Sequence, residues 1–156
     1  MSSEDRKKLE DAINEITAQL NELREAIQIV QNRIATISNE LNELRLAFET
    51  INVIEKYGGQ REALLALDRR GYAYIRASIT VSNEAIVHIG QDIYVSLPLD
   101  KAKSVLSMRE RDLISALREA EAEFRKLSDI YTQLQKKLQE YVTVLTQQQH
   151  AQHTAG

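Results

Sequence analysis

The apolar residues in the first third of the chain follow a regular spacing of alternately four and three positions. The residues that carry this spacing are Leu9, Ile13, Ile16, Leu20, Leu23, Ile27, Val30, Ile34, Ile37, Leu41, Leu44, Phe48 and Ile51. A sustained repeat of about 3.5 residues predicts a narrow left-handed coiled-coil seam, because a globular helix carries a wider apolar stripe with a period of about 3.6. We therefore expect one long helix over residues 4–56, ended by the glycine pair at 58 and 59.

The same spacing returns in the last third of the chain, at Leu113, Leu117, Ala120, Phe124, Leu127, Tyr131, Leu134, Leu138, Tyr141 and Leu145. We expect this second helix to begin at Pro98-Leu99-Asp100, because proline is favoured in the first helical turn. Between residues 100 and 112 the repeat is looser, and Val105, Leu106 and Met108 are expected to pack on the central segment. Beyond Leu145 the periodicity is lost, which predicts a polar tail.

The central segment changes to a two-residue period. Residues 72–81 alternate small or branched apolar side chains with polar or tyrosine side chains, as expected of a strand with one buried face. We predict strands near 63–67, 72–80, 85–89 and 93–97, paired as two hairpins through turns at 68–71 and 90–92. Tyr72, Tyr74 and Tyr94 are expected to share one strand face and to pack beneath the helices or against other subunits.

Together these patterns predict a mainly α fold with a small β insert. Two helices would form an antiparallel coiled-coil hairpin, with two β-hairpins at the bend and with positions whose numbers add to about 156 lying opposite each other. The predicted segments of this single structural unit are helix 1 over 1–57, a β head over 58–98, helix 2 over 99–148 and the polar tail over 149–156. Four short strands bury too little surface to be stable alone, so the head is expected to need partners.

Charge and composition narrow the possible partners and compartments. The formal net charge is −3 and the pI is about 5.7, so neither nucleic acid nor an anionic membrane surface is an expected partner. The chain contains no cysteine, its first residues lack the basic and apolar regions of a secretory signal, and no apolar run approaches the roughly 20 residues of a membrane span. We expect a cytoplasmic protein.

Residues capable of catalysis or metal binding do not cluster in the sequence. His88 stands alone in a predicted strand, the carboxylates alternate with basic residues along the helices, and no glycine-rich phosphate-binding loop is present. Arg69, Arg70 and Arg76 form a small basic spot on the head, which is too small for a nucleic-acid footprint. We predict no enzymatic activity, no catalytic residues, no bound metal and no cofactor.

The order of long helix, two β-hairpins and long helix resembles the α-type subunit of prefoldin. The most specific part of the resemblance is the insert, in the segments Glu62-Ala63-Leu64-Leu65-Ala66-Leu67, Gly71-Tyr72-Ala73-Tyr74-Ile75 and Ala85-Ile86-Val87-His88-Ile89-Gly90-Gln91-Asp92-Ile93-Tyr94-Val95. The presence of two hairpins rather than one indicates the α type. The turn Asp68-Arg69-Arg70-Gly71 departs from the small, glycine-rich turn of the family.

This resemblance implies an ATP-independent holding chaperone. It implies a hexamer of two α-type and four β-type prefoldin subunits, whose strands merge into a central platform that carries six coiled coils. Such a complex would capture unfolded client proteins between the coiled-coil tips and pass them to a group II chaperonin. The residues that we expect to assemble the head are Leu65, Leu67, Tyr72, Tyr74, Ile75, Ile79, Val87, Ile89, Ile93 and Val95.

Client binding is expected at the end of the coiled coil that lies opposite the β head. We predict that a tip group holds apolar segments of unfolded proteins: Leu9, Ile13, Ile16, Tyr141, Val142, Val144 and Leu145. Val142 and Val144 lie off the seam of helix 2, so a two-helix rod cannot cover all of these side chains. The alternative is that the tip group has no binding role and is an ordinary end of the seam with surface valines. A different class of function, a structural scaffold or filament built through the head, also fits the pattern.

Overall fold

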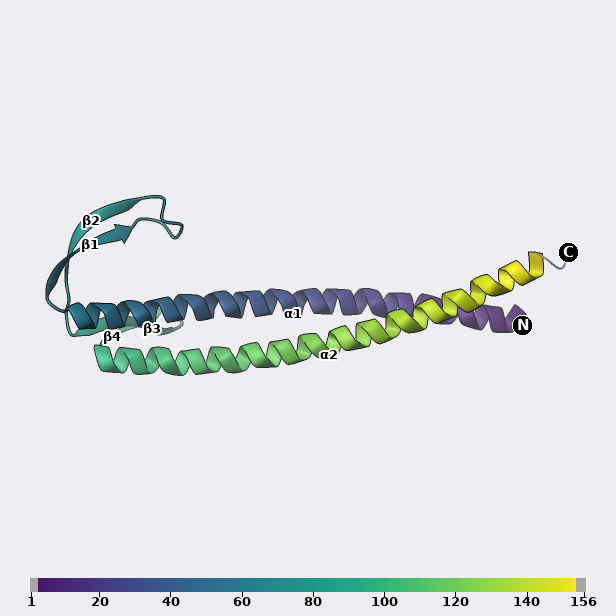
Figure 1. Ribbon diagram of the computed structural model, residues 1–156. Coiled ribbons are helices and arrows are strands. Elements are labelled where there is room, and N and C mark those ends of the chain that lie inside the picture. Colours follow the sequence, from purple (N-terminus) through teal and green to yellow (C-terminus); the bar gives the residue numbers. More distant parts are fainter. Residues whose placement is uncertain (1–2, 154–156) are drawn as a thin grey trace. The chain divides into compact units, whose positions relative to one another are not determined.

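The computed structural model describes residues 3–153 of the chain, with side-chain surroundings for residues 4–147. Two long antiparallel helices are joined by two β-hairpins, which confirms the predicted fold class (Figure 1). The elements, in chain order, are α1 (Ser3–Tyr57), β1 (Gln60–Ala66), β2 (Tyr74–Thr80), β3 (Glu84–Gly90), β4 (Ile93–Pro98) and α2 (Leu99–His153). Their contacts form two compact units, one of Met1–Ser38 with Ala116–Gly156 and the other of Asn39–Ser115.

The ends of α1 follow from its sequence. Glu4 in the first turn and Lys56 in the last turn place opposite charges where the helix dipole favours them. The helix ends because Gly58 and Gly59 adopt φ values of +44° and +70°, a left-handed conformation that glycine tolerates best. The Gly58 N–H donates to the Ile54 carbonyl over 3.0 Å, which satisfies one of the last helical acceptors.

The second helix begins at Leu99, directly after the single proline, as predicted. Its N-terminus is joined to the insert, because the Leu99 N–H donates to the Asn83 carbonyl over 3.0 Å. The helix continues to His153, five residues beyond the boundary expected at 148. The remaining part of the predicted polar tail, 154–156, lies outside the described residues.

The predicted seams form the core of both units. In the unit that contains the chain ends, Ile16, Leu20, Val30 and Ala120 are buried, and the other seam positions are half-buried. Polar contacts flank the seam in the predicted register: Arg33 pairs with Glu123, and the Arg24 guanidinium donates to the Tyr131 hydroxyl over 3.1 Å. In the unit that contains the hairpins, Leu41 and Ala102 are buried, with ion pairs between Arg45 and Glu110 and between Lys103 and Glu55.

One expectation about the start of α2 is wrong. Met108 was expected to pack on the central segment, but its side chain is 58% exposed. The inward face of this part of α2 instead follows Ala102, Val105 and Leu106, and Met108 lies on the opposite side of the helix. Ala102 is fully buried, which a pattern based on large apolar residues does not reveal.

The insert forms two separate two-stranded sheets, β1–β2 and β3–β4. In β1–β2 the register places Ala63 opposite Ala77 and Leu65 opposite Ile75 on one face, whereas Leu64 lies opposite Arg76 on the other face. The predicted alternation is therefore present. This chain does not bury the apolar face as expected, because the side chains of Leu65 and Ile75 are 42% and 47% exposed.

Asp68 organises the turn between β1 and β2. Its carboxylate accepts backbone N–H groups from Arg70 at 2.8 Å, Tyr72 at 3.2 Å and Ala73 at 3.1 Å. These hydrogen bonds, chiefly the one from Tyr72, hold the pKa of Asp68 below its ordinary value of 3.8. At Gly71, φ is +73°, a left-handed conformation that favours glycine over residues with a Cβ.

Stability should depend on the seam and not on the outer helix surface. We expect Leu41→Ala to lower the free energy of unfolding by about 2–4 kcal/mol, because it removes a buried side chain and leaves a cavity. The same substitution at Leu46, which is 60% exposed on the same helix, should change it by less than about 0.5 kcal/mol. Urea unfolding followed by helix circular dichroism measures both. Equal losses would contradict the assignment of the seam.

The β1–β2 turn should weaken in acid. A carboxyl whose pKa is lowered on folding stabilises the folded state above its unfolded-state pKa, and that stabilisation is lost as the pH falls through the folded-state value. We expect Asp68→Ala to reduce amide protection in residues 68–74 at pH 7 and to abolish most of its pH dependence. Hydrogen-exchange mass spectrometry, with Glu62→Ala on the same hairpin as a control, measures this. Unchanged protection in Asp68→Ala would contradict the role of the carboxylate.

Candidate functional site

The predicted tip group divides by exposure. Val142 and Val144 are 44% and 43% exposed, as expected of residues off the seam. Leu9, Ile13, Tyr141 and Leu145 are half-buried along the seam. Ile16 is 5% exposed and belongs to the core between the helices, so it packs in the seam and does not face solvent.

Val142 contributes to a groove between the two helices of its unit. Leu20 and Leu138 provide further apolar surface, and the polar rim is formed by Thr17, Asn21, Arg24, Tyr131, Thr132, Gln135, Lys136 and Gln139. The hydrogen bond from Arg24 to Tyr131 crosses from one helix to the other within this groove, and it raises the pKa of the Arg24 guanidinium. The groove therefore combines an apolar floor with neutral and cationic hydrogen-bonding groups.

Val144 lines a second hollow, which lies on α2. Its other lining residues are Lys136, Gln139, Glu140 and Thr143, all from the same helix. The two exposed valines thus serve different surfaces rather than one patch, because neighbouring positions on a helix point in different directions. An extended apolar segment that contacted both valines would have to wrap around α2.

The β1–β2 hairpin has an unburied apolar face. The predicted head residues Leu65, Ile75 and Ile79 lie on it, together with Ala63 and Ala77, and Leu67 continues the same alternation past the end of β1. A two-stranded hairpin with one solvent-exposed apolar face is not stable on its own, and each of its strands also has a free edge. This geometry is suited to pairing with strands of other subunits.

The β3–β4 hairpin uses one face within its own chain. Val87 is buried beside Leu44 and Ile51 of α1 and Leu106 of α2, and the Arg109 guanidinium donates to the His88 carbonyl over 3.5 Å. Val95, opposite Val87, is half-buried, so these two predicted assembly residues pack at least partly on the helices. Ile89 and Ile93 at the turn are each 51% exposed and remain available to another subunit.

The three tyrosines do not share one strand face, contrary to expectation. Tyr72 precedes β2 in the turn and is 80% exposed, whereas Tyr74 lies within the β1–β2 sheet. Tyr94 belongs to the separate β3–β4 sheet, where its ring lies 4.9 Å from that of His88. The expectation failed because a two-residue period shows which positions alternate but not which strands share a sheet.

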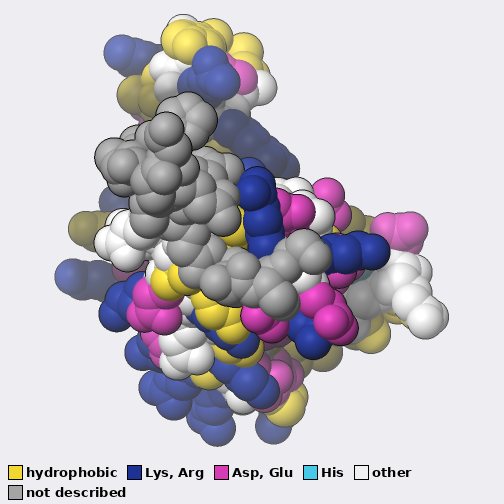
Figure 2. Space-filling model, turned by 90° about the vertical axis from the view of Figure 1, so that its right-hand side faces the viewer, with side chains coloured by type: hydrophobic (Ala, Val, Ile, Leu, Met, Phe, Trp, Pro, Cys, Tyr) yellow, Lys and Arg dark blue, Asp and Glu magenta, His cyan; other side chains and the backbone are white. Residues whose placement is uncertain are grey.

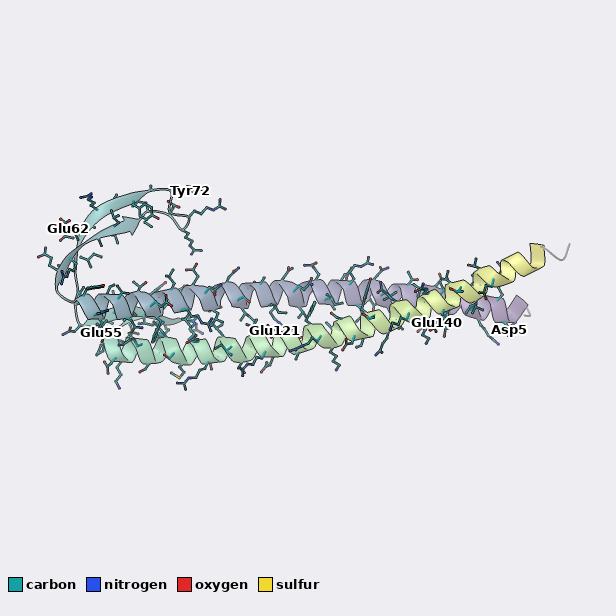
Figure 3. The ribbon with its side chains drawn as sticks, viewed as in Figure 1. Asp5, Glu55, Glu62, Tyr72, Glu121 and Glu140 are labelled. Carbon is teal, nitrogen blue, oxygen red and sulfur yellow. The ribbon has the colours of Figure 1, made fainter. Side chains whose placement is uncertain are left out.

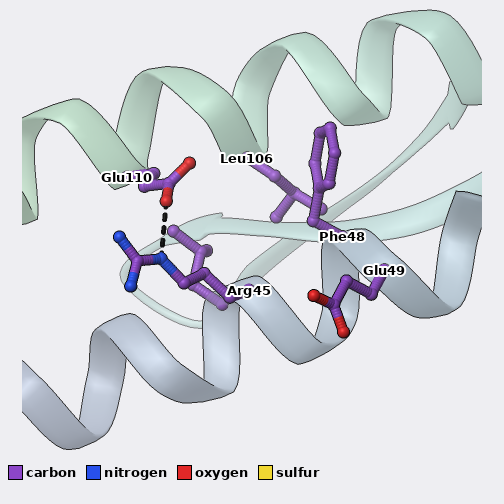
Figure 4. A pocket seen from close by; sticks show the side chains of 6 residues that line it. Arg45, Phe48, Glu49, Leu106 and Glu110 are labelled. Atoms are coloured by element: carbon purple, nitrogen blue, oxygen red, sulfur yellow. Dashed lines mark hydrogen bonds and ion pairs between the residues drawn. The ribbon is translucent and has the colours of Figure 1, made fainter.

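A further hollow beside the hairpins belongs to the helix packing and has no catalytic lining. It lies between Phe48 of α1 and Leu106 of α2, next to the ion pair between Arg45 and Glu110 at 2.7 Å (Figure 4). Glu49 also lines it, but no histidine or hydroxyl nucleophile does. These residues close the seam and hold the helices in register.

The described part of the chain shows no group of three or more His, Cys, Asp or Glu side chains that could hold a metal ion. His88 has a buried Nε2 atom without a hydrogen-bond partner, and its surroundings are an aromatic ring and the Arg109 contact rather than metal ligands. None of the described helices is both long enough and apolar enough to cross a membrane.

Sequence reasoning missed several exposed apolar side chains. Leu64 and Ile86 on the hairpins are 66% and 76% exposed, and Leu46, Val53 and Tyr57 are exposed on α1. A strand pattern assigns such residues to the core by default, and only the observed register shows that Leu64 and Leu65 face opposite ways. The seam spacing did contain the signal for Leu46 and Val53, since neither falls on a seam position.

Comparisons with known proteins agree with this architecture. The prefoldin family, described as "Prefoldin subunit", matches residues 23–143. The α subunit of prefoldin from Metallosphaera sedula is 30% identical over 123 residues, which cover 79% of this chain and 84% of that protein. The corresponding subunit from Aeropyrum pernix is 32% identical over 126 residues, which cover 80% and 82%.

A solved structure also matches. A chain in the cryo-EM structure of filamentous PFD from Methanocaldococcus jannaschii has a TM-score of 0.49 and 20% sequence identity, covering 80% of this chain and 95% of that one. The family match covers most of each helix and the whole insert, where the two hairpins lie. With its similarity to the α subunits of two archaeal prefoldins, this shows that the chain belongs to the prefoldin family.

Proposed function

We propose that this prefoldin subunit holds unfolded proteins at the tip group and assembles through its head with β-type subunits into a hexamer of two α-type and four β-type chains. The general function follows from the family. Prefoldin α subunits are not enzymes and form complexes with β subunits, and the complex is a chaperone that delivers unfolded proteins to a chaperonin. We further propose the cytoplasm as its location and a group II chaperonin as the acceptor.

The observation that best supports client holding at the tip is the exposure of Val142 and Val144 beside the interhelical groove. Burial of apolar surface contributes about 25 cal/mol per Å², so a tip that covers a few hundred Å² of a client gives only weak affinity once the cost of association is included. Several tips acting on one client would raise the overall affinity through effective concentration. Weak individual contacts also allow release to a chaperonin.

The groove supports binding that tolerates many sequences. Its rim has amide, hydroxyl and cationic groups from residues such as Asn21, Gln135 and Lys136, which can hydrogen-bond to the exposed backbone of an unfolded chain. A native protein presents few free backbone groups next to apolar side chains, because its own secondary structure satisfies them. A groove that offers both apolar surface and hydrogen-bonding groups therefore favours binding of non-native segments over native surfaces.

Assembly is supported by the apolar face of the β1–β2 hairpin. Leu65, Ile75 and their neighbours expose this face in the isolated chain, and a partner strand or sheet would remove it from water. The opposite face carries the polar side chains of Arg76, Ser78 and Thr80 together with Leu64 and Tyr74, so it is more polar than the first. The hairpin is thus two-sided, with one face suited to the interior of an assembly.

Removing the exposed tip valines should reduce client holding. We expect Val142→Ser with Val144→Ser to lower suppression of client aggregation at least about tenfold, because each hollow loses its exposed valine side chain. Light scattering of a chemically unfolded test protein, diluted into the assembled complex, measures this. Leu9 is left unchanged because it is half-buried in the seam.

The matched control is Ile29→Ser with Ile130→Ser, which also removes two exposed branched side chains from the helices but leaves the tip intact. This control should keep normal suppression of aggregation. Full activity of the valine variant, in a complex of unchanged mass, would contradict client holding at the tip.

Neighbouring residues on β1 should differ sharply in assembly. Leu65→Asp places a charge on the apolar face, so we expect it to prevent a stable complex with a β-type subunit. Leu64→Asp places the same charge on the opposite face and should leave the complex intact. Native mass spectrometry of co-expressed subunits distinguishes these results. Assembly of Leu65→Asp, or open-ended filaments of this chain alone, would contradict the proposed hexamer.

A further inference from the structure

The outward face and turn of the β1–β2 hairpin carry a cluster that neither client holding nor assembly uses. We name it the arginine–tyrosine patch, and it consists of Leu64, Arg69, Arg70, Tyr72, Tyr74 and Arg76. Tyr72 lies at the turn end of the hairpin in Figure 3, and in Figure 2 the uppermost atoms show Lys or Arg side chains beside hydrophobic ones. The three apolar or aromatic members are 57–80% exposed.

The patch lies on the side of the hairpin that assembly leaves free. Leu64 pairs with Arg76, and Ala66 pairs with Tyr74, so these side chains project from the face opposite Leu65 and Ile75. If the apolar face is buried against other subunits, the patch points away from them. It therefore remains exposed in both the single chain and the assembled complex.

The charge of the hairpin is opposite to that of the chain as a whole. Residues 60–80 contain four arginines against one glutamate and one aspartate, whereas the net charge of the chain is −3. Arg61 donates to the Tyr57 carbonyl, and Asp68 is engaged by the turn amides. In the described part of the chain no carboxylate forms an ion pair with Arg69, Arg70 or Arg76.

The backbone that carries Arg69 and Arg70 is ordered by the turn. Three backbone N–H groups donate to Asp68, so the carboxylate holds the backbone between the strands. The Arg70 guanidinium also lies 3.5 Å from the Tyr72 hydroxyl. A preorganised surface loses less conformational entropy on binding than a flexible loop would.

We infer that this patch is a docking surface for an acidic protein segment that carries an apolar side chain. Exposed arginines pair with carboxylates through paired hydrogen bonds, and tyrosine and arginine are the residue types that contribute most at protein interfaces. Leu64, which lies directly opposite Arg76 in the register, supplies an apolar contact for the anchor side chain. A nucleic acid is a poorer match for this patch, because three arginines on a chain of net negative charge are too few to form a phosphate-binding surface.

The test uses the chain assembled with a β-type prefoldin subunit and two fluorescein-labelled peptides. One peptide is Glu-Glu-Leu-Glu-Glu-Phe-Glu-Glu, and the other has lysine in place of every glutamate. We expect fluorescence anisotropy to show binding of the acidic peptide at least about tenfold tighter than of the basic one. Binding should weaken when NaCl is raised from about 50 to about 500 mM, because exposed charges are screened.

The patch variant combines Arg69→Ala, Arg70→Ala and Arg76→Ala. We expect it to bind the acidic peptide at least about tenfold more weakly. The matched control is Arg111→Ala with Arg118→Ala and Arg125→Ala, which removes the same charge from exposed positions on α2 and should change binding less than about twofold. Leu64→Ser should weaken binding at constant charge. Aggregation suppression by the patch variant should stay normal, so failure of this inference is separate from failure of client holding.

Three results would overturn the inference. The first is equal binding of the acidic peptide by the patch variant and the control variant. The second is no measurable binding of the acidic peptide by the unmodified complex. The third is tighter binding of a labelled 20-nucleotide oligothymidylate than of the acidic peptide, with loss in the patch variant, which would assign the surface to nucleic acid.

Discussion

The packing of the α1 seam against the α2 seam is the interaction on which the other features depend. It buries Ile16, Leu20 and Val30 in one unit and Leu41 and Ala102 in the other. Flanking ion pairs such as Arg33 with Glu123 and Arg45 with Glu110 are exposed and contribute little energy, but they are consistent with a single register. Without that register, neither the interhelical groove at Val142 nor the support for β3 would exist.

The seam accounts for most of the regularly spaced apolar residues, and the large apolar side chains that are exposed lie outside it. On the hairpins, Leu65 and Ile75 form a face that the chain itself does not cover. On α2, Val142 and Val144 stay exposed where the seam residues beside them are half-buried. In the proposed function, the head is available to partner subunits and the tip to clients.

The sequence alone predicted the helices and their register, because a 3.5-residue period is a local signal that persists over many turns. Every residue assigned to the two seams is buried or half-buried, and the hairpin turns at Asp68 and Gly90 lie where the turn residues placed them. The strands were located to within a few residues and were paired correctly as two hairpins, but the separation of the hairpins into two sheets was not predicted. Tyr94 was placed on one face with Tyr72 because a period-two pattern does not say whether two hairpins share a sheet.

The candidate site was less predictable than the fold. Ile16 and Val144 both belonged to the predicted tip group, yet one is buried and the other faces a hollow separate from that of Val142. The role of Asp68 depends on three amides that converge through backbone geometry, which residue types do not encode. Likewise, the arginine–tyrosine patch emerges only when the register places Leu64 beside Arg76 and away from Leu65.

The most direct test of the account is the distance between the two helices near the chain ends. The chain contains no cysteine, so spin labels can be attached cleanly to Asn14→Cys and Thr143→Cys, which are both exposed positions. Helices packed 8–10 Å apart predict a distance between the labels of roughly 20–30 Å by pulsed electron resonance, with labelled chain diluted by unlabelled chain in the assembled complex. A distance beyond about 50 Å would show that the seams do not pair within one chain, since helices of this length can separate by that much when unpaired.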